Sequence, residues 1–147
     1  MASLNDFSKR IRIRARRVTE GADRLVRKVA IAADQAVVSA TPVDTGRARS
    51  NWIVAMNSPA SQVIRAYAPG KSGDSAQKNE AAAVAQGQAV ISGYKSGNEI
   101  HITNNLAYIG ELNDGSSRQA PANFVEESIL EAARVVQSTL IVDGGKR

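Results

Sequence analysis

The sequence contains no cysteine and only one histidine, His101. Disulfide bonds and thiolate metal sites are therefore excluded, and so are zinc sites built from several histidines. His101 stands between Ile100 and Ile102 in a short alternating segment, where a packing or surface role is more common than a ligand role. No carboxylate pair or metal-spaced cluster stands out, so we expect no cofactor, no metal and no enzymatic activity.

Aromatic residues are scarce and long apolar runs are missing. Aromatic residues make up 4% of the 147 residues, and much of the 43% apolar fraction is alanine. Such a composition predicts a thin core that neighbouring subunits would help to stabilise. No apolar run approaches the roughly 20 residues that span a bilayer, and the N-terminus lacks a signal-peptide core. We therefore expect a cytosolic protein with no membrane partner.

Charge is unevenly distributed along the chain. The net charge is +5, and residues 9–28 hold nine of the nineteen basic side chains. Residues 98–147 carry seven acidic against four basic side chains. One end is thus positive and the other mildly negative, a polarity that suits contacts between unlike surfaces.

The hydrophobic pattern predicts a single α+β domain over residues 1–147, in which a long N-terminal helix and further helices pack on a small antiparallel sheet. Small or apolar residues recur every three or four positions from about Leu4 to Ala40, with Ser3 or Asn5 as the cap and Gly21 as a weak point or bend. The remaining segments are a turn and hairpin in 41–67 (strands 49–56 and 63–67), a loop and alanine-rich helix in 68–97, a strand, loop and helix in 98–142, and a frayed tail in 143–147.

Two helix starts carry capping-box patterns. Asp74 with Gln77 precedes the alanine-rich helix, and Asn123 with Glu126 precedes the last helix. The expected buried stripe of that last helix comprises Val125, Ile129, Ala132, Val136 and Leu140.

Two short motifs have possible catalytic meanings. Asp44-Thr45-Gly46 is the tripeptide of aspartic proteases, but Pro42 and Arg47 replace the apolar flanks that this chemistry needs. A turn in which Asp44 bonds nearby amides is the favoured interpretation, and a hydrolase is a remote alternative.

The second motif, Gly70-Lys71-Ser72, matches the end of a phosphate-binding loop, but Arg65 stands where the first glycine is required. We expect the loop 68–79 to be disordered alone and to order on docking.

The basic part of the first helix suggests nucleic acid as an alternative partner. Arg10, Arg14 and Arg17 lie on one side and are the candidate DNA contacts. No aromatic stacking set accompanies them, so a solvated face or a face that pairs with a neighbour's acids is the commoner meaning. A small basic nucleic-acid-binding protein remains an alternative function.

Two stretches resemble a known family. The first is Thr41-Pro42-Val43-Asp44-Thr45-Gly46-Arg47-Ala48-Arg49-Ser50-Asn51-Trp52, which follows a long amphipathic helix. The second runs from Ile102 to Gly115 and is followed by Gln119-Ala120-Pro121-Ala122-Asn123-Phe124-Val125 and a last helix. This pairing is similar to the neck and tail-completion (minor tail component) proteins of long-tailed bacteriophages. The resemblance covers about residues 1–60 and 98–142. Asn113-Asp114 departs from the glutamate and aromatic residue that many relatives carry before the glycine.

The resemblance implies a structural virion protein of the head-to-tail connector. Such a subunit forms a ring, usually of six copies, that joins the tail tube to the head, and a tail terminator is the alternative role. Its partners would be copies of itself and the connector and tail tube proteins, with non-specific contact to DNA in the channel. It would be located in the neck or tail of the virion, and in the host cytoplasm during assembly.

Ring closure requires one surface to meet a different one on the next copy, and opposite charges suit this. The expected interface residues are Arg12, Arg16, Arg24, Asp44, Arg47, Tyr108, Glu111, Arg118, Glu126 and Glu127.

Overall fold

The computed structural model describes residues 3–144, and side chains up to residue 138. The elements in order are α1 (Leu4–Ala40), α2 (Arg47–Ser50), β1 (Ile53–Met56), α3 (Ala76–Ile91), β2 (Ile100–Thr103), α4 (Ile109–Glu111), the π-helical turn η1 (Leu112–Ser116) and α5 (Phe124–Gly144). The long first helix, the further helices and the small antiparallel sheet confirm the predicted α+β class.

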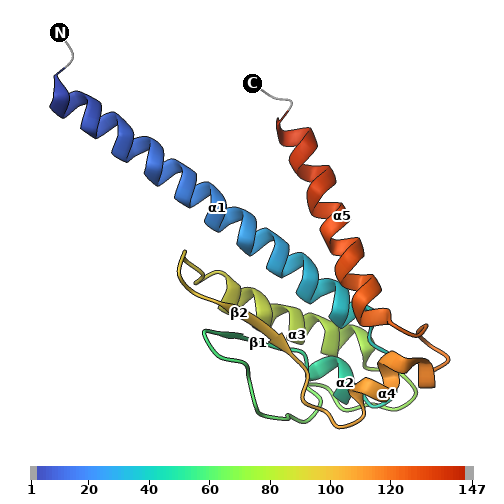
Figure 1. Ribbon diagram of the computed structural model, residues 1–147. Helices are drawn as coiled ribbons and strands as arrows, with labels where there is room; N and C mark the ends of the chain where they lie inside the picture. The colour runs from blue at the N-terminus through green and yellow to red at the C-terminus, as the bar shows by residue number, and fades with distance from the viewer. Residues whose placement is uncertain (1–2, 145–147) are drawn as a thin grey trace.

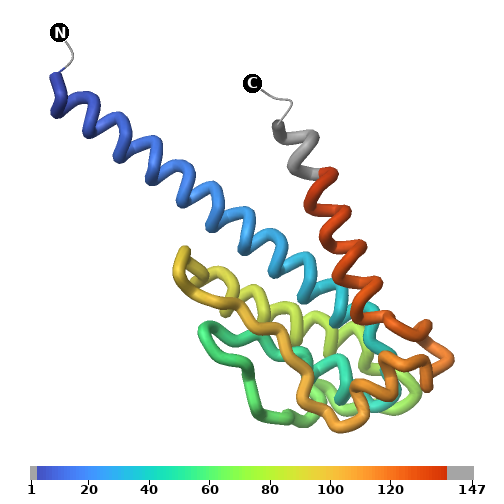
Figure 2. Tube along the Cα trace, viewed as in Figure 1, coloured from blue at the N-terminus to red at the C-terminus, as the bar shows by residue number. Residues whose placement is uncertain are grey.

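Helix α1 lies between two layers (Figure 1). Helix α5 packs against its C-terminal end on one side, and α3 and the sheet lie on the other. Helices α1 and α5 then diverge, so that the N-terminal part of α1 extends beyond the rest of the chain (Figure 2). No helix within the described residues combines the length and apolar character needed to cross a membrane.

The ends of α1 follow the sequence signals. Ser3 caps the start, because its hydroxyl accepts from the Asp6 amide while the Asp6 carboxylate accepts from the Ser3 amide. The helix continues through Gly21 without interruption. It ends at Thr41, which takes the extended conformation that the following Pro42 imposes.

The predicted hairpin between strands 49–56 and 63–67 is wrong. Strand β1 pairs antiparallel with the distant β2, with Ile53 opposite Thr103 and Met56 opposite Ile100. Residues 47–50 form the short helix α2, and residues 63–67 form no strand. The physical reason is that side-chain amides bond the backbone groups that a hairpin partner would bond. Gln86 pairs with Val54 of β1, and Asn51 pairs with Ile64.

Both predicted capping boxes are also wrong. Helix α3 begins after Ser75 without a side-chain cap, and Asp74 instead accepts from the Lys71 amide at 2.8 Å. At the start of α5, Asn113 Oδ1 accepts from the Val125 amide at 3.0 Å, and Asn113 Nδ2 donates to Glu126. Asn113, ten positions before Asn123, thus caps the helix in place of Asn123, which has a φ of 62°.

The buried face of α5 differs from the predicted stripe. Phe124, Ala132 and Val136 are buried, whereas Ile129 is 47% exposed. These buried residues are separated by multiples of four positions, because α5 packs against α1 with one face only. The Leu140 side chain lies outside the described residues. Helix α5 reaches Gly144, so the start of the predicted tail is helical, and residues 145–147 lie outside the description.

The core is small. Its buried centre comprises Val37, Val38, Trp52 and Ala83, with Val84, Ile102, Ile109 and Val125 packed around it. Gly87 of α3 lies against Asp34 of α1, where a Cβ atom would overlap the Asp34 carboxylate. The absence of a side chain at this position lets the two helices approach closely.

Candidate functional site

The two segments that carry the family resemblance lie against each other and enclose a cavity of about 320 Å³. We call it the motif pocket. Its lining comes from the turn 42–48 and from the segment 108–119. Asp44, Arg47 and Tyr108, three of the expected interface residues, are exposed at this pocket. Segments about 60 residues apart in the chain thus form one surface.

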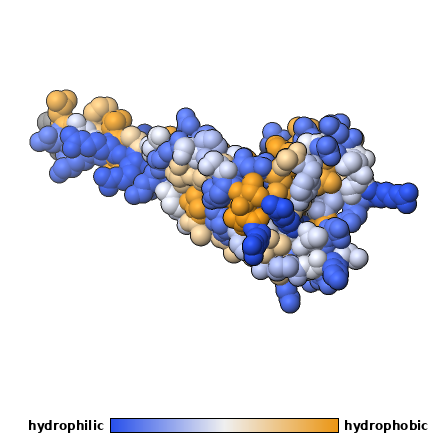
Figure 3. All heavy atoms as spheres, turned by 90° about the horizontal axis from the view of Figure 1, so that it is seen from below, coloured by the Kyte–Doolittle hydropathy of each residue, from blue (hydrophilic) through white to orange (hydrophobic). Residues whose placement is uncertain are grey.

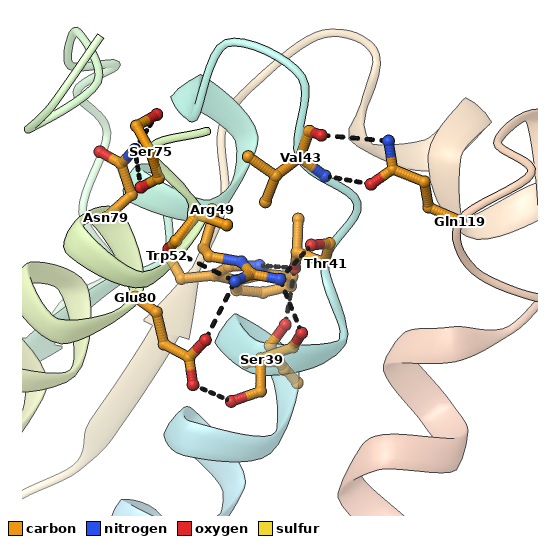
Figure 4. Close-up of polar contacts among 11 residues, drawn as sticks. Ser39, Thr41, Val43, Arg49, Trp52, Ser75, Asn79, Glu80 and Gln119 are labelled. Atoms are coloured by element: carbon orange, nitrogen blue, oxygen red, sulfur yellow. Dashed lines mark hydrogen bonds and ion pairs between the residues drawn. The ribbon is translucent and has the colours of Figure 1, made fainter. Parts of the chain in front are cut away.

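Two side-chain amides join the walls of the motif pocket. Gln119 accepts from the Val43 amide at 2.9 Å and donates to the Val43 carbonyl at 3.0 Å (Figure 4). Asn104 donates to the carbonyl of Ala48 at 2.9 Å. These bonds satisfy backbone groups that no strand partner reaches, and they fix the spacing of the two segments.

The Gln119–Val43 arrangement recurs three times in the body of the protein. In each case one side-chain amide accepts from the N–H and donates to the C=O of a single backbone residue, as a neighbouring strand would. The pairs are Asn51 with Ile64, Asn79 with Ala68, Gln86 with Val54, and Gln119 with Val43. We call these four pairs the amide clamps. One of them bonds the free edge of β1, and the other three hold backbone segments that belong to no strand.

Asn79 is the most connected clamp residue. It is fully buried, and it also bonds the Ser50 hydroxyl and the Ser75 hydroxyl, each at 2.9 Å (Figure 4). Gly46 packs against the Asn79 side chain and has a φ of 85°, and a Cβ atom at Gly46 would overlap the Asn79 amide. Asn79 therefore ties the loop before α3 to α2 and requires the glycine of the Asp-Thr-Gly turn.

Arg49 and Trp52 hold the C-terminal end of α1 (Figure 4). Arg49 donates to the carbonyls of Ser39 and Thr41 at 2.8 and 2.9 Å and pairs with Glu80 at 3.0 Å. Burial lowers the pKa of Arg49, and the charge of Glu80 acts in the opposite direction. Trp52 Nε1 donates to the Thr41 hydroxyl at 2.7 Å. A positive charge at a helix C-terminus is favourable.

The loop before α3 is fastened to the Asp44 turn. Asp44 Oδ1 accepts from the Ser72 amide and the Asp44 carbonyl from the Gly73 amide, both at 3.0 Å. The amides of Gly70 and Lys71 donate to Thr45 and Asp74. Asp44 therefore binds an amide 28 positions away, not a nearby one as predicted. All four amides of this glycine-lysine-serine loop are used within the chain, which leaves no cradle for a phosphate.

Asp34 is a buried carboxyl group that sequence analysis did not single out. It is 1% exposed, and its Oδ1 accepts no hydrogen bond from any residue that the structure describes. Burial raises the pKa of Asp34 to about 7. The pKa of Tyr67 is also raised, first by burial and then by the charge of Asp34. A carboxyl group in this position favours its neutral form.

The expected charged contacts lie at opposite ends of the molecule (Figure 1). Residues 4–30 of α1 carry nine basic and three acidic side chains, and Arg12, Arg16 and Arg24 are exposed there. Residues 99–131 carry six acidic side chains and one arginine, and their exposed members include Glu111, Glu126, Glu127 and Arg118. The hydrogen bond from Asn113 lowers the pKa of Glu126. The N-terminal part of α1 and the region of α4 lie at opposite ends of the molecule, so charges on these two parts cannot pair within one chain.

The structure thus groups Asp44, Arg47 and Tyr108 and places the arginines of α1 elsewhere. The amide clamps were missed because an asparagine or glutamine in a polar sequence gives no signal of a backbone partner. Among the described residues, no three histidine, aspartate or glutamate side chains are grouped to hold a metal ion. Comparisons with known proteins found no matching family model, no matching curated protein and no matching solved structure.

Proposed function

We propose that this chain is a non-enzymatic structural subunit that assembles into a ring, in the manner of the neck and tail-completion proteins that it resembles. The motif pocket carries the proposal, because both segments of the resemblance contribute to that single exposed surface. A pocket with Asp44 and Arg47 at its rim suits a protein contact that is partly polar.

Charge distribution supports contacts between unlike ends of successive copies. The basic N-terminal part of α1 and the acidic segment around α4 and the start of α5 lie at opposite ends of one molecule, so they can meet only between molecules. A surface that meets a different surface closes into a ring or continues as a filament. Arg12, Arg16 and Arg24 would then approach acids such as Glu111, which fixes register more than affinity.

Light scattering of the purified chain, across protein and salt concentrations, tests this proposal. We expect a ring-sized oligomer, or a monomer that assembles only with connector or tail proteins. Reversing two charges, in the variant Arg12→Glu/Arg16→Glu, should weaken assembly. Assembly that is unchanged in this variant would contradict the charge pairing.

Nucleic-acid binding is the second candidate function. The observation that favours it is the exposed group of Arg10, Arg14 and Arg17 on the projecting helix. It predicts a monomer that binds duplex DNA tightly at low salt and releases it at high salt, since each neutralised phosphate adds to the salt dependence. The same scattering series with duplex DNA distinguishes the two functions. A tail terminator remains the alternative within the structural class.

A further inference from the structure

The projecting part of α1 carries an uncovered apolar seam. Its members recur every three or four residues and therefore share one face of the helix: Leu4, Phe7, Ile11, Ala15, Val18, Ala22, Leu25 and Val29. The large side chains among them are between 37% and 87% exposed. Figure 3 shows hydrophobic groups among the hydrophilic ones along this part of the molecule. A contiguous exposed seam of this length marks an interaction surface.

The seam continues into a contact that already exists within the chain. Ala33, Ala36 and Ala40 extend the same spacing and are half-buried at the end of α1 where α5 packs (Figure 2). The side chains that approach α3 and β1, such as Asp34, lie on the other side of α1. The seam thus runs without a break from the packed end of α1 into the exposed part of the helix.

The seam is suited to another helix more than to a lipid surface. It is narrow, and alanines alternate with larger residues, as in helix–helix contacts of the coiled-coil type. Helices that lie on membranes have a wider apolar face rich in tryptophan, phenylalanine and leucine.

A second α1 does not suit the seam. At 100° per residue, Arg10 and Arg14 lie beside the seam, whereas Asp6, Glu20 and Asp23 lie on the far side. Two α1 seams in contact would bring these arginines together without acids between them, which is unfavourable.

Helix α5 has the complementary surface. Ile129 and Leu130 are 47% and 59% exposed, and Glu126 and Glu127 lie one turn before Leu130. Arg134 lies one turn after it and pairs with Glu131 at 3.4 Å. We propose that the α1 seam of one copy packs on this exposed face of α5 in a second copy, with Arg10 and Arg14 beside Glu126 and Glu127. The two surfaces differ, so the contact repeats from copy to copy. The inference rests on the proposed ring and names the helices that form its contact.

Ile11 and Ile13 provide a matched pair for the test. They are the same residue type, two positions apart and similarly exposed at 48% and 53%, but only Ile11 lies in the seam. Ile11→Gln should raise the dissociation constant of self-association about tenfold or more, as for a central contact residue. Ile13→Gln should leave it within about twofold. Sedimentation measures both, and circular dichroism verifies that the variants are folded.

A charge exchange tests the α5 side. Arg14→Glu should weaken association, and the double variant Arg14→Glu/Glu127→Lys should restore most of it, because the pair is then reversed across the contact. The single variant Leu130→Gln should weaken association to a similar degree as Ile11→Gln.

The outcomes separate this inference from the proposed ring. If the wild type forms rings and Ile11→Gln assembles equally well, the inference is overturned and the ring proposal stands. If Ile11→Gln and Ile13→Gln weaken self-association equally, the seam is not the contact surface. A wild type that remains monomeric with all its partners contradicts both. If the protein is a monomer that binds anionic vesicles and Ile11→Gln abolishes this binding, the partner of the seam is a membrane and not a second copy.

Discussion

The two parts of α1 have the same periodicity but are stabilised differently. Residues 31–40 are held by Arg49, Trp52 and the packing of α5, whereas most side chains of residues 4–30 are exposed. A helix in water gains little from propensity alone, so tertiary contacts provide most of its stability. The comparison teaches that one amphipathic pattern can be buried in a core at one end of a helix and stay exposed at the other.

The body compensates for a small sheet with polar contacts. Four amide clamps and the Arg49 network connect segments that are distant in sequence. Buried polar groups of this kind are costly to leave without partners. Substitutions in the body should therefore have large effects on global stability, and substitutions in the projecting part small ones.

Trp52→Ala should have the largest effect. It removes a buried ring of the core and the bond to Thr41, and the free energy of unfolding should fall by about 3–5 kcal/mol. Urea denaturation followed by circular dichroism measures this change. The control Ile13→Ala, in the projecting part, should change it by less than about 0.5 kcal/mol. If both variants lose a similar free energy of unfolding, the body and the projecting part do not differ in their contribution to global stability.

Asp34 predicts a pH dependence of stability. Its folded-state pKa is about 7 and its ordinary value is 3.8, so the unfolded chain releases this proton first as the pH rises. The free energy of unfolding should therefore fall between about pH 4 and pH 7 and then level off.

Asp34→Asn should abolish this contribution and make the protein more stable than the wild type at pH 8, by about 2–4 kcal/mol. Denaturation of both proteins at pH 5 and pH 8 gives the difference. A variant that loses stability with pH to the same degree as the wild type would refute the role of Asp34.

Gln86→Glu tests an amide clamp. The carboxylate can still accept from the Val54 amide but cannot donate to the Val54 carbonyl, which loses its partner. The free energy of unfolding should fall by about 1–3 kcal/mol. Gln88→Glu, on the exposed side of the same helix, carries the same change in charge and should be nearly neutral. Equal effects would show that charge, and not the clamp, is responsible.

Gly21→Ala should have the smallest effect, and it is local. A Cβ at this position meets open space, with only the Arg24 guanidinium at 3.9 Å. Alanine favours the helix by about 1 kcal/mol, which corresponds to roughly fivefold slower hydrogen exchange around residue 21. The global free energy of unfolding should change little. An increase of the same size in global stability would indicate that the projecting part unfolds together with the body.

The sequence predicted the helices well and the strand partners poorly. The spacing of apolar residues marked α1, the alanine content marked α3, and alternation marked β2. The same alternation around Trp52 marked β1 only in part, because Arg49 and Ser50 form a helical turn. Alternation gives no information on which strand is the partner, and chain proximity favours the nearest segment, 63–67, over the true partner β2.

The candidate site was predicted in part for a similar reason. Asp44, Arg47 and Tyr108 were expected at an interface, and the structure places them together at the motif pocket. Gln119 and Asn79 were not expected to be important, since a side-chain amide shows its partner only when a distant backbone segment lies beside it.

By itself the sequence determined the length and amphipathic character of α1 and the uneven distribution of charge, because these depend on residues within a few turns of each other. Only the tertiary structure decided which part of the apolar seam is covered, which strand pairs with β1 and where Asp34 is buried. Those outcomes depend on contacts between residues far apart in the chain, where loop closure and packing of the whole determine which partner is close enough to bind.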